Sequence, residues 1–563
     1  MPKIWKICSQ DPKQQVKLSN ALGVHPIVAQ LLINREITDL KEAKDFFSAD
    51  LSTMHDPLLL KNMDKAVKRI ARAGAKGEKI LIVGDYDVDG ITSSVLLNKI
   101  LRQLGIRVAH YIPHRMNDGY GLNEHVSRIA VNEGAGLVIA VDCGITAHHA
   151  VDLVNRQNVD VIVIDHHEPN AAELPAAFAI INPKQRDCPY PFKHLASVGL
   201  VTKLAQAMLG RESSEHVLDL AAIGTVADVV PLRGENRVLV KSGLPKISAT
   251  KNKGLMALLE LTKIKDKKLT PFHIGFVIGP RINAAGRMDS AQTSLDLFLS
   301  EDSQEAYELA RALDKHNVQR QAMQRNIIEE ALALAEQEIN FKEQKVIVLQ
   351  KEGWHRGVLG IVASHLTEKY YRPSIVISVD NGIGTASARS IDGFHLHEAL
   401  ASCAEYLEEF GGHAGAAGLT IKAENIDPFR ALINQVAHET LELKKLMPTL
   451  VIDGEIPLSM VNLELAEIID AMAPFGEGNP APVFCSRQVT VKSRPALLGK
   501  NTLKFWVCDN DYAISAVGFG MGEYQGIISA GQKIDLAYEI SIDDWNKSPV
   551  PQLKLKDIRL SEG

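Results

Sequence analysis

The sequence has few cysteines, no long apolar run and no excess of basic charge. Its six cysteines form no Cys-x-x-Cys pair, which argues against a zinc site or a redox dithiol and favours free thiols in a reducing compartment. No apolar run approaches the roughly 20 residues of a membrane-spanning helix. The segment Met1–Trp5 also lacks the charged-then-apolar order of a signal peptide. We therefore expect a cytoplasmic protein with no membrane contact.

The charge balance limits how the protein could bind nucleic acid. A formal net charge of −6 excludes a surface that is basic throughout, so such binding would depend on local basic patches in a groove. The length of 563 residues allows about three or four domains. With 46% hydrophobic and 23% charged residues, the composition is that of a folded globular chain.

Three short apolar runs in the first half of the chain predict a parallel sheet. Ile80–Val83, Leu137–Val141 and Val161–Ile164 are continuous apolar segments of the kind that form strands buried on both faces. They alternate with helical segments, which is typical of βαβ units. In such sheets, ligands bind outside the carboxyl ends of the strands. Acidic or histidine residues follow each run, so we expect these side chains to meet at one edge.

The first acidic group lies within Gly84–Gly90 and contains Asp85, Asp87 and Asp89. If the strand continues through them, its period of two directs all three side chains to the same side. Three like charges at one place require a cation. The same pattern resembles the start of a calcium loop, but the distal bidentate glutamate and the flanking helix pair are missing. The group therefore favours a divalent-metal site of another kind.

A mixed nitrogen and oxygen group follows the third run. His166 and His167 stand beside Asp165, and imidazole with carboxylate suits Mn²⁺ or another first-row divalent ion, with Mg²⁺ possible. Asp165 could orient one ring as a hydrogen-bond acceptor. Asp142, after the second run, could instead cap a helix that starts near Thr146. Together the groups favour a two-metal hydrolase.

Asp228 follows Leu218–Ala227, a mostly apolar segment. A buried carboxylate there needs a partner, and a metal ion would supply one. No Ser-His-Asp or Cys-His arrangement can be supported from spacing, which agrees with hydrolysis that uses no side-chain nucleophile.

Changes in pattern divide the chain into five expected parts. Few breakers and many helix formers predict one long helix over Ser303–Glu338. The last part contains about five short β-rich runs, which suit a Greek-key barrel of the oligonucleotide-binding type. The expected parts are a helical leader over 1–45, a parallel-sheet α/β catalytic domain over 46–300, a connecting helix over 301–340, a smaller α/β domain over 341–442, and an OB-like β-barrel over 450–563.

The ordered motifs resemble the DHH phosphoesterase family and, within it, the single-strand-specific exonucleases. The resemblance covers nearly the whole chain. Its motifs are Asp85–Ser93, Asn117–Leu122, Val141–Thr146, Asp165–Glu168 and the Asp228 segment, followed in the second lobe by Gly384–Ser390 and Gly411–Gly418. The resemblance implies a DHH domain, a DHH-associated domain and an oligonucleotide-binding module.

The resemblance also implies an activity and its site residues. The expected reaction is 5′-to-3′ hydrolysis of single-stranded DNA by two divalent cations, Mn²⁺ or Mg²⁺, in recombination and repair. The implied metal ligands and catalytic residues are Asp87, Asp89, Asp142, His166 and Asp228, with Asp85 and His167 adjoining the metals. The implied partners are single-stranded DNA with a 5′ end, single-stranded DNA-binding protein and a RecQ-type helicase.

A phosphate site is expected in the second lobe. Ser387 and Arg389 alternate at the end of an apparent strand, and arginine can donate two hydrogen bonds to one phosphate. The resemblance implies that a 5′ phosphate is held there. The further candidates are Arg115, Arg281, Arg287 and His413. A surface ion pair is the alternative role for each arginine, and a packed turn residue is the alternative for His413.

Base stacking and two rival functions complete the expectations. The aromatic candidates are Tyr120, Trp354, Phe394 and Phe505, although core packing is the commoner role of such residues.

A DHH hydrolase of small or cyclic dinucleotides would share the metal residues but would have no evident use for the barrel. A non-catalytic DNA-binding scaffold should have lost acidic ligands, and this sequence retains them.

Overall fold

The structure is a computed structural model that describes residues 3–114, 121–170, 173–543 and 548–561. Within these ranges the chain forms two compact units. One consists of 1–4, 287–289 and 312–450, of which the first two residues are not described. The other consists of 5–286, 290–311 and 451–563. Each unit is described by itself below.

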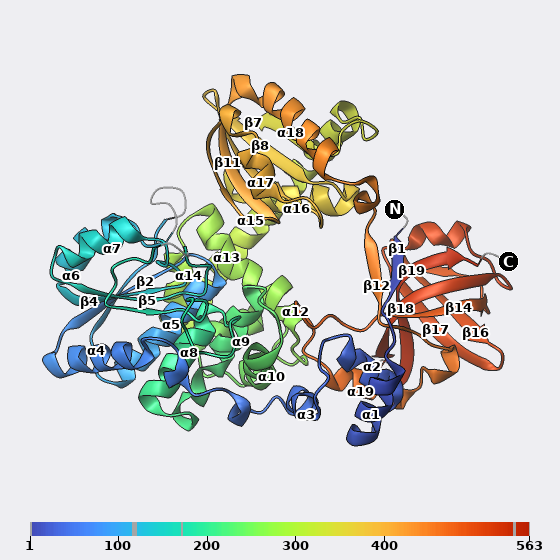
Figure 1. Cartoon of the computed structure of the whole chain (residues 1–563), viewed down its shortest axis with the longest axis horizontal. Helices are drawn as coiled ribbons and strands as arrows, with labels where there is room; N and C mark the ends of the chain where they lie inside the picture. Colours follow the sequence, from blue (N-terminus) through green and yellow to red (C-terminus); the bar gives the residue numbers. More distant parts are fainter. Residues whose placement is uncertain (1–2, 115–120, 171–172, 544–547, 562–563) are drawn as a thin grey trace. The chain divides into compact units, whose positions relative to one another are not determined.

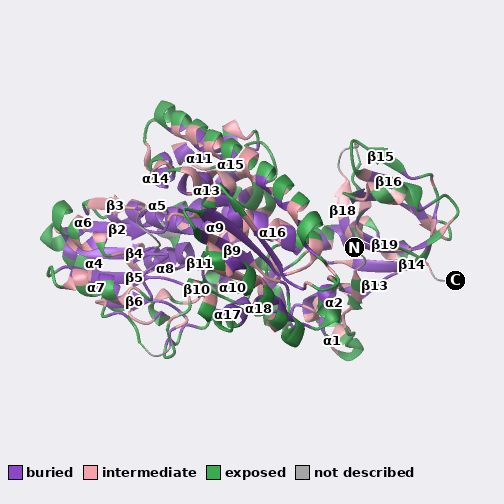
Figure 2. Cartoon of the chain, turned by 90° about the horizontal axis from the view of Figure 1, so that it is seen from above, coloured by how far each residue is buried: buried purple, intermediate pink, exposed green. Residues whose placement is uncertain are grey.

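The larger unit contains a five-stranded parallel sheet in the order β3-β2-β4-β5-β6. Its central strands, β2, β4 and β5, are the three predicted from apolar runs, and almost all of their residues are buried (Figure 2). The predicted parallel α/β sheet is therefore confirmed. The strand bounds are β2 (Lys79–Gly84), β3 (Val108–Tyr111), β4 (Ala135–Val141), β5 (Asp160–Ile164) and β6 (Ala179–Ile181).

Helices cover the sheet, and α5, α8 and α9 pack against one another beside it (Figure 1). Apolar residues of α6 and α7 share a core with β2, β4 and β5. The helices of this region are α4 (Met63–Lys76), α5 (Val88–Gln103), α6 (His125–Glu133), α7 (His148–Asn155), α8 (Ser197–Leu209), α9 (Leu218–Ala227), α10 (Gly234–Ser248), α11 (Lys253–Leu261), α12 (Pro271–His273), α13 (Gly279–Met288) and α14 (Gln292–Leu299).

The smaller unit contains a mixed sheet in the order β10-β11-β9-β8-β7. In this sheet β7 and β8 are parallel, whereas the pairs β8–β9, β9–β11 and β11–β10 are antiparallel. The strands are β7 (Ile347–Glu352), β8 (Ser374–Asp380), β9 (Ile383–Arg389), β10 (Leu407–Gly412) and β11 (Ala416–Lys422), and the helices are α16 (Leu359–Tyr370), α17 (Leu396–Ala401) and α18 (Ile426–Thr440).

One long helix, α15 (Ser303–Glu338), has the bounds expected from the sequence. The boundary between the two units falls within it, at Arg311 and Ala312. Apolar residues in its second half, including Ile327 and Ala331, pack with the α16 side of the mixed sheet. A continuous run without glycine or proline explains why the helix extends over 36 residues.

The C-terminal strands form a ring. The sheet order is β13-β14-β18-β19-β17-β16-β15, and an additional β14–β16 pairing closes it, as expected for an oligonucleotide-binding fold. The strands of the ring are β13 (Gly454–Glu455), β14 (Phe484–Val491), β15 (Ala496–Leu498), β16 (Thr502–Asp509), β17 (Tyr512–Phe519), β18 (Lys533–Asp543) and β19 (Val550–Leu560), with helix α19 (Leu463–Ala471). Strand β12 (Thr449–Ile452) precedes them in the chain and lies outside this sheet.

The N-terminal segment shares a core with this ring. It begins with a strand, β1 (Ile4–Ile7), which the expected helical leader did not include, and continues with α1 (Pro12–Leu22), α2 (Pro26–Ile33) and α3 (Leu40–Ser48). Leu31 and Phe46 belong to the same buried cluster as Phe484 and Leu536 of the ring. In the described ranges no single helix is long and apolar enough to cross a membrane, and the bent pair α1–α2 meets that test by length and composition only.

Candidate metal centre

The three aspartates after β2 do not lie on an extended strand. The strand ends at Gly84, Asp87 is the N-cap of α5, and Asp89 lies in the first turn of that helix. The Asp87 side chain accepts a hydrogen bond from the Gly90 amide over 3.1 Å. The expected alternation along a strand is therefore wrong, because a carboxylate that caps free helical amides starts the helix at once. The convergence of Asp85, Asp87 and Asp89 depends instead on the turn that leads from β2 into α5.

Asp142 follows β4 in a left-handed backbone conformation with φ of 62°. Its alternative role as a helix cap is not observed, because α7 starts at His148 and its N-cap is Ala147. Val229, directly after Asp228, is also left-handed, with φ of 60°. This conformation is costly for a β-branched residue such as Val229, whereas aspartate adopts it more readily. Asp228 is thus held next to strained backbone.

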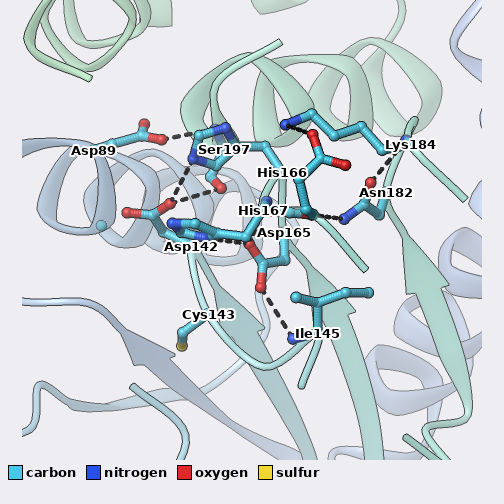
Figure 3. Close-up of polar contacts among 12 residues, drawn as sticks. Asp89, Asp142, Cys143, Ile145, Asp165, His166, His167, Asn182, Lys184 and Ser197 are labelled. Carbon is cyan, nitrogen blue, oxygen red and sulfur yellow. Dashed lines mark hydrogen bonds and ion pairs between the residues drawn. The ribbon is translucent and has the colours of Figure 1, made fainter. Parts of the chain in front are cut away.

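His166 and His167 follow β5, at the same sheet edge as Asp142. Asp165 accepts from the His167 ring nitrogen Nδ1 over 2.7 Å and from the Ile145 amide over 3.0 Å (Figure 3). Asp165 therefore orients one histidine ring, as the sequence predicted. His166 Nε2 lies 3.4 Å from both Asp142 Oδ1 and Asp228 Oδ2.

All seven side chains predicted to surround the metals come together. They form three overlapping groups, each with ligand atoms within 4.8 Å of one another: Asp142, His166 and His167; Asp89, His166 and Asp228; and Asp85, Asp87 and Asp142. His166 and Asp142 are shared between groups. Overlap of this kind suits two neighbouring cations that share ligands.

Ser197, at the start of α8, is a part of this centre that sequence reasoning missed. Its amide donates to Asp89 Oδ2 over 2.7 Å, and the next amide, of Val198, donates to Asp89 Oδ1 over 2.9 Å. Its hydroxyl donates to Asp142 Oδ1 over 3.0 Å (Figure 3). The helix N-terminus thus orients one acid with backbone amides and another with a side chain. The only sequence signal is a serine at a helix start, which is too common to identify it.

Burial controls the protonation of the centre. Burial, reinforced by Asp87, raises the pKa of Asp89 to about 7, although the amides of Val198 and Ser197 oppose the shift. Burial, followed by Asp89 and Asp87, raises the pKa of Asp228 to about 9. The pKa of Asp142 is also well above its ordinary value, first through burial and then through the neighbouring carboxylates. These carboxylates therefore resist ionisation together when no cation is bound.

The pKa values of the two histidines shift in opposite directions. Burial and then His167 lower the pKa of His166 to about 3, so its ring is neutral near pH 7 and retains a lone pair. Burial also acts to lower the pKa of His167, but the Asp165 hydrogen bond and charge outweigh it and raise that pKa. His166 is therefore the histidine that is ready to bind a cation.

Gly224 of α9 sets how closely α9 approaches α5. A Cβ atom at this position would lie 2.4 Å from Thr92 Oγ1 and 2.9 Å from Asp89 Oδ1. A side chain at this position therefore requires the two helices, or the side chains of Thr92 and Asp89, to move. The same helix carries Asp228 as its C-cap, so the close approach also determines where that acid lies.

In the smaller unit, Ser387 and Arg389 alternate on β9, as predicted, with Arg389 as the last residue of the strand. A Cβ atom at Gly360, in the first turn of α16, would lie 3.0 Å from Arg389 Nη2 and 3.7 Å from Ser387 Oγ. The two side chains therefore lie together beside the start of that helix. His413 is exposed in the turn between β10 and β11.

The remaining phosphate candidates are not gathered at one place by any described contact. Arg281, in α13 of the larger unit, donates to the Val277 carbonyl over 2.7 Å. Arg287, in the smaller unit, donates to the Gly357 carbonyl over 3.1 Å. Arg115 lies outside the described residues. Each described arginine thus makes a backbone contact, and its expected role in holding phosphate remains a prediction.

The aromatic candidates from the sequence are mostly core residues. Trp354, Phe394 and Phe505 are 4%, 3% and 1% exposed, and Tyr120 lies outside the described residues. Instead, Phe272 and Phe276 are 61% and 71% exposed, and their rings stack with centroids 4.9 Å apart. The sequence gives no sign of this pair, because exposure depends on the surrounding fold.

The phenylalanine pair lies on α12 and on the π-helical segment η4 (Ile274–Ile278) that follows it. The segment packs against α9, the helix that Asp228 caps. Gly279, which directly follows η4, lies beside Val88 and Ala227, the immediate neighbours of metal-centre residues. The exposed rings and the metal centre are therefore on directly packed elements of the same unit.

Comparisons with known proteins agree with this architecture. The model of the DHH family, N-terminal domain, matches residues 79–225, the DHHA1 domain matches 343–439, and the RecJ OB domain matches 452–557. The single-stranded-DNA-specific exonuclease RecJ of Haemophilus influenzae is 34% identical over 564 residues, which cover 96% of this chain and 97% of that protein. The chain belongs to the RecJ family.

Other RecJ proteins give the same result. RecJ of Bacillus subtilis is 40% identical over 561 residues, which cover 99% of this chain and 71% of that protein. The crystal structure of RecJ in complex with Mn²⁺ from Thermus thermophilus superposes with a TM-score of 0.85 at 29% identity, covering 100% of this chain and 80% of that one. The fold class and the single-strand exonuclease function expected from the sequence are thus confirmed for a member of the RecJ family.

Proposed function

We propose that this chain hydrolyses the phosphodiester bonds of single-stranded DNA from the 5′ end and releases nucleotides in recombination and repair. The observation that carries the proposal is the convergence of acids and imidazoles from β2–α5, β4, β5 and α9. Family membership supports the substrate, because the relatives are single-stranded-DNA-specific exonucleases. Polarity from the 5′ end rests on the resemblance of the motifs.

The residues of the centre fit divalent cations. Two of their buried atoms, His166 Nε2 and Asp228 Oδ2, have no hydrogen-bond partner among the described residues. Burying such polar atoms without partners costs free energy unless a ligand binds to them. We propose Mn²⁺ or Mg²⁺, with Asp87, Asp89, Asp142, His166 and Asp228 as ligands and with Asp85 and His167 adjoining. When bound, two such cations lower the pKa of water and stabilise the charge that develops on the phosphate oxygens.

The protein's own groups prepare this centre. Asp165 holds the His167 ring by its Nδ1 atom, and the amides of Ser197 and Val198 hold both oxygens of Asp89. One histidine ring and one carboxylate of the centre are thus oriented before a ligand arrives. Pre-orientation of this kind reduces the reorganisation that the reaction would otherwise require.

We assign the 5′ phosphate to Ser387 and Arg389, whose side chains lie together beside the start of α16. A hydroxyl and a guanidinium can both donate to one phosphate, and the guanidinium can do so with two N–H groups. Arg115, Arg281, Arg287 and His413 are proposed as further contacts to the strand. Their contribution would be to position the backbone without reading its sequence.

Phe272 and Phe276 are proposed as a stacking surface for unpaired bases. Every base has a π-face, so stacking on exposed aromatic rings binds a strand without regard to sequence. In a duplex the bases already stack on one another and their faces are covered. Contact with these rings therefore favours single strands. We propose that Arg281, on the following helix, contacts the phosphate backbone of the same strand.

The test is hydrolysis of a 5′-phosphorylated oligonucleotide labelled at one end or the other, with Mn²⁺ present. Hydrolysis from the 5′ end releases a 5′ label at once as a mononucleotide, whereas a 3′ label remains on progressively shorter strands. The opposite pattern would refute the proposed polarity. A duplex of the same sequence and a dinucleotide are the comparison substrates, and preferred turnover of the dinucleotide would point to a small-molecule hydrolase.

The phosphate assignment has its own matched test. Arg389→Lys keeps the charge but loses the two-pronged donor, so it should reduce the preference for a 5′-phosphorylated strand over a 5′-hydroxyl strand. Arg430→Lys, at an arginine of α18 that pairs with Asp427, is the control and should leave that preference unchanged. An unchanged preference in Arg389→Lys would contradict the assignment.

Three further expectations are kept as proposals. We propose single-stranded DNA-binding protein and a RecQ-type helicase as partners, on the family resemblance. We propose the cytoplasm as the location, supported by the free state of all six cysteines. We also propose the domain limits: a leader over 1–45, domains over 46–300, 341–442 and 450–563, and a connecting helix over 301–340.

A further inference from the structure

A cavity of about 660 Å³ opens in the larger unit, and none of the metal-centre residues lines it. Its volume is within the roughly 300–1,000 Å³ that is typical of small-molecule sites. The wall comes from the C-terminal half of α5, the starts of α9 and α11, and the ends of α10 and α14. Phe298 and Leu299 supply an apolar side, and the rest is polar or charged. Nothing in the proposed nuclease reaction uses this cavity.

Basic side chains outnumber acidic ones in its lining. The basic residues are Lys99, Arg102, Lys246, Lys251 and Lys253, and the acidic residues are Glu215, Asp219 and Glu301. Two of the acids already have partners. Glu215 pairs with Lys246 over 2.9 Å, and Asp219 accepts from the Thr250 hydroxyl over 2.6 Å and from the Leu220 amide over 2.8 Å. The cavity therefore presents a net positive surface to a ligand.

Lys99 is the most informative of these residues. It is half-buried on α5, and among the described residues its ammonium makes no hydrogen bond and no ion pair within 4.0 Å. Burial lowers its pKa, against the weaker opposing effects of Asp219 and Glu301. A half-buried ammonium without a bonded partner is costly, and an anion in the cavity would compensate it.

The start of α11 adds to this surface. Its N-cap, Asn252, and its first residue, Lys253, line the cavity together with Lys251. The amino end of a helix carries partial positive charge and favours phosphate groups. Lys251 is exposed, so its ammonium is available to a ligand at the mouth.

The cavity is separate from the metal centre, although the same helices lead to both. Asp89 is in the first turn of α5, and Lys99 lies further along that helix by about 15 Å of helical rise. Asp219 is in the first turn of α9, and Asp228 caps the other end. A ligand in the cavity would thus contact one end of each helix while the metal residues occupy the other.

From this geometry we infer a second binding site, which takes a small phosphate-bearing ligand of nucleotide size. Lys99, Lys251 and the start of α11 bind the phosphate, and the side formed by Phe298 and Leu299 receives the less polar part of the ligand. This inference goes beyond the proposed nuclease activity and does not depend on it.

The experiment is a calorimetric titration of the full-length protein in chelator, which removes divalent cations and weakens phosphate binding at the metal centre. The titrants are deoxyadenosine 5′-monophosphate, inorganic phosphate and deoxyadenosine. We expect the two phosphate compounds to bind at one site and deoxyadenosine not to bind. Tighter binding of the nucleotide than of inorganic phosphate would support a site of nucleotide size. Equal binding of the two would show that the apolar side contributes nothing and would overturn that part of the inference.

Variants locate the binding. Lys99→Gln and Lys251→Gln should each weaken it at least about ten-fold, the loss expected for one charged hydrogen bond. Lys76→Gln, at an exposed lysine of α4, is the matched control and should bind normally. Asp142→Asn should also bind normally, which separates this site from the metal centre. Thermal unfolding of each variant checks that it is folded.

Three results would overturn the inference. The first is the absence of saturable binding of either phosphate compound at millimolar concentration. The second is binding that Asp142→Asn abolishes and the two lysine variants preserve. The third is an oligothymidylate without terminal phosphates that binds in a Lys99-dependent way more tightly than the mononucleotide, which would make the cavity part of a strand path.

Discussion

The Ser197 hydroxyl donates a hydrogen bond to Asp142 Oδ1 over 3.0 Å, while the amide of the same serine holds Asp89. One residue at a helix start therefore orients two acids from different parts of the sheet edge. Ser197→Ala removes the hydroxyl and leaves the amide. Because partners of this kind typically contribute 10–100-fold to metal affinity, we expect Mn²⁺ to bind about 10–100-fold more weakly. Calorimetry measures this, with Ser127→Ala on the surface of α6 as the control.

Asp142 is shared between two of the three ligand groups, so its loss should disable the centre as a whole. Asp142→Asn keeps the size of the side chain and removes its charge. We expect cleavage of a labelled single strand to fall at least about a thousand-fold, because metal stabilisation contributes several kcal/mol to the transition state. Binding of the strand should survive. Asp152→Asn, an exposed acid of α7, should cleave normally, and normal cleavage by Asp142→Asn in a clean preparation would refute the site.

The raised carboxyl pKa values make the stability of the metal-free protein depend on pH. An aspartate in an unfolded chain titrates near ~3.9, whereas the folded-state pKa of Asp89 is about 7 and that of Asp228 is about 9. The folded state therefore binds these protons more tightly. The stability that these two protonated carboxyls contribute is fully present below the pKa of an unfolded aspartate. It is lost as the pH rises through the folded-state pKa of Asp89, about 7, and then that of Asp228, about 9.

In chelator we expect the free energy of unfolding to decrease across this range, and Asp228→Asn should reduce the decrease above pH 7. Cation binding must displace the same protons, so Mn²⁺ should stabilise the protein more at the alkaline end and should release protons into the buffer. Urea unfolding at several pH values provides the measurement. A metal-free protein that became steadily more stable toward alkaline pH would contradict the assignment.

Gly224→Ala tests the close approach of α9 and α5. The added Cβ would lie 2.4 Å from Thr92 Oγ1 and 2.9 Å from Asp89 Oδ1, so the helices or Asp89 must move. We expect a loss of about 1–3 kcal/mol in unfolding free energy, together with weaker Mn²⁺ binding. Gly526→Ala is the control, because no atom lies within 4 Å of a Cβ there. Unchanged metal affinity in Gly224→Ala would mean that Asp89 tolerates the shift.

Phe276→Ala tests the exposed aromatic pair. Removing one ring should weaken binding of an oligothymidylate by about 1–3 kcal/mol, the usual contribution of one stacked base. Phe276→Leu is the matched control for apolar area and should restore only part of the loss. Fluorescence anisotropy in chelator measures binding without cleavage. Equal affinity of the alanine variant and the unaltered protein would exclude these rings from the strand path.

The sequence predicted the sheet edge and its acids because both depend on local patterns. Continuous apolar runs identify buried strands, and the carboxyl ends of neighbouring parallel strands must meet, so Asp142 and His166 could be brought together without coordinates. The conformation around Asp87 was predicted wrongly, because helix capping overrode the extended continuation of β2.

Other features could not be predicted because they arise only from tertiary packing. Ser197 matters through contacts with acids 108 and 55 residues away, and no local pattern marks such a pairing. Phe276 is exposed while Phe505 is buried, although both are aromatic residues in apolar surroundings. Burial is decided by which elements pack above a residue, and a single sequence does not contain that information directly.

The amides that hold Asp89 belong to a helix that begins 108 residues further along the chain. Until that long loop closes, the acid at the start of α5 lacks the groups that orient it. Contacts between such distant residues form late, because loop closure costs entropy before the contact compensates it. Cation capture should therefore be a final step of folding, and stripping the cations should first loosen the junction of α5 and α8.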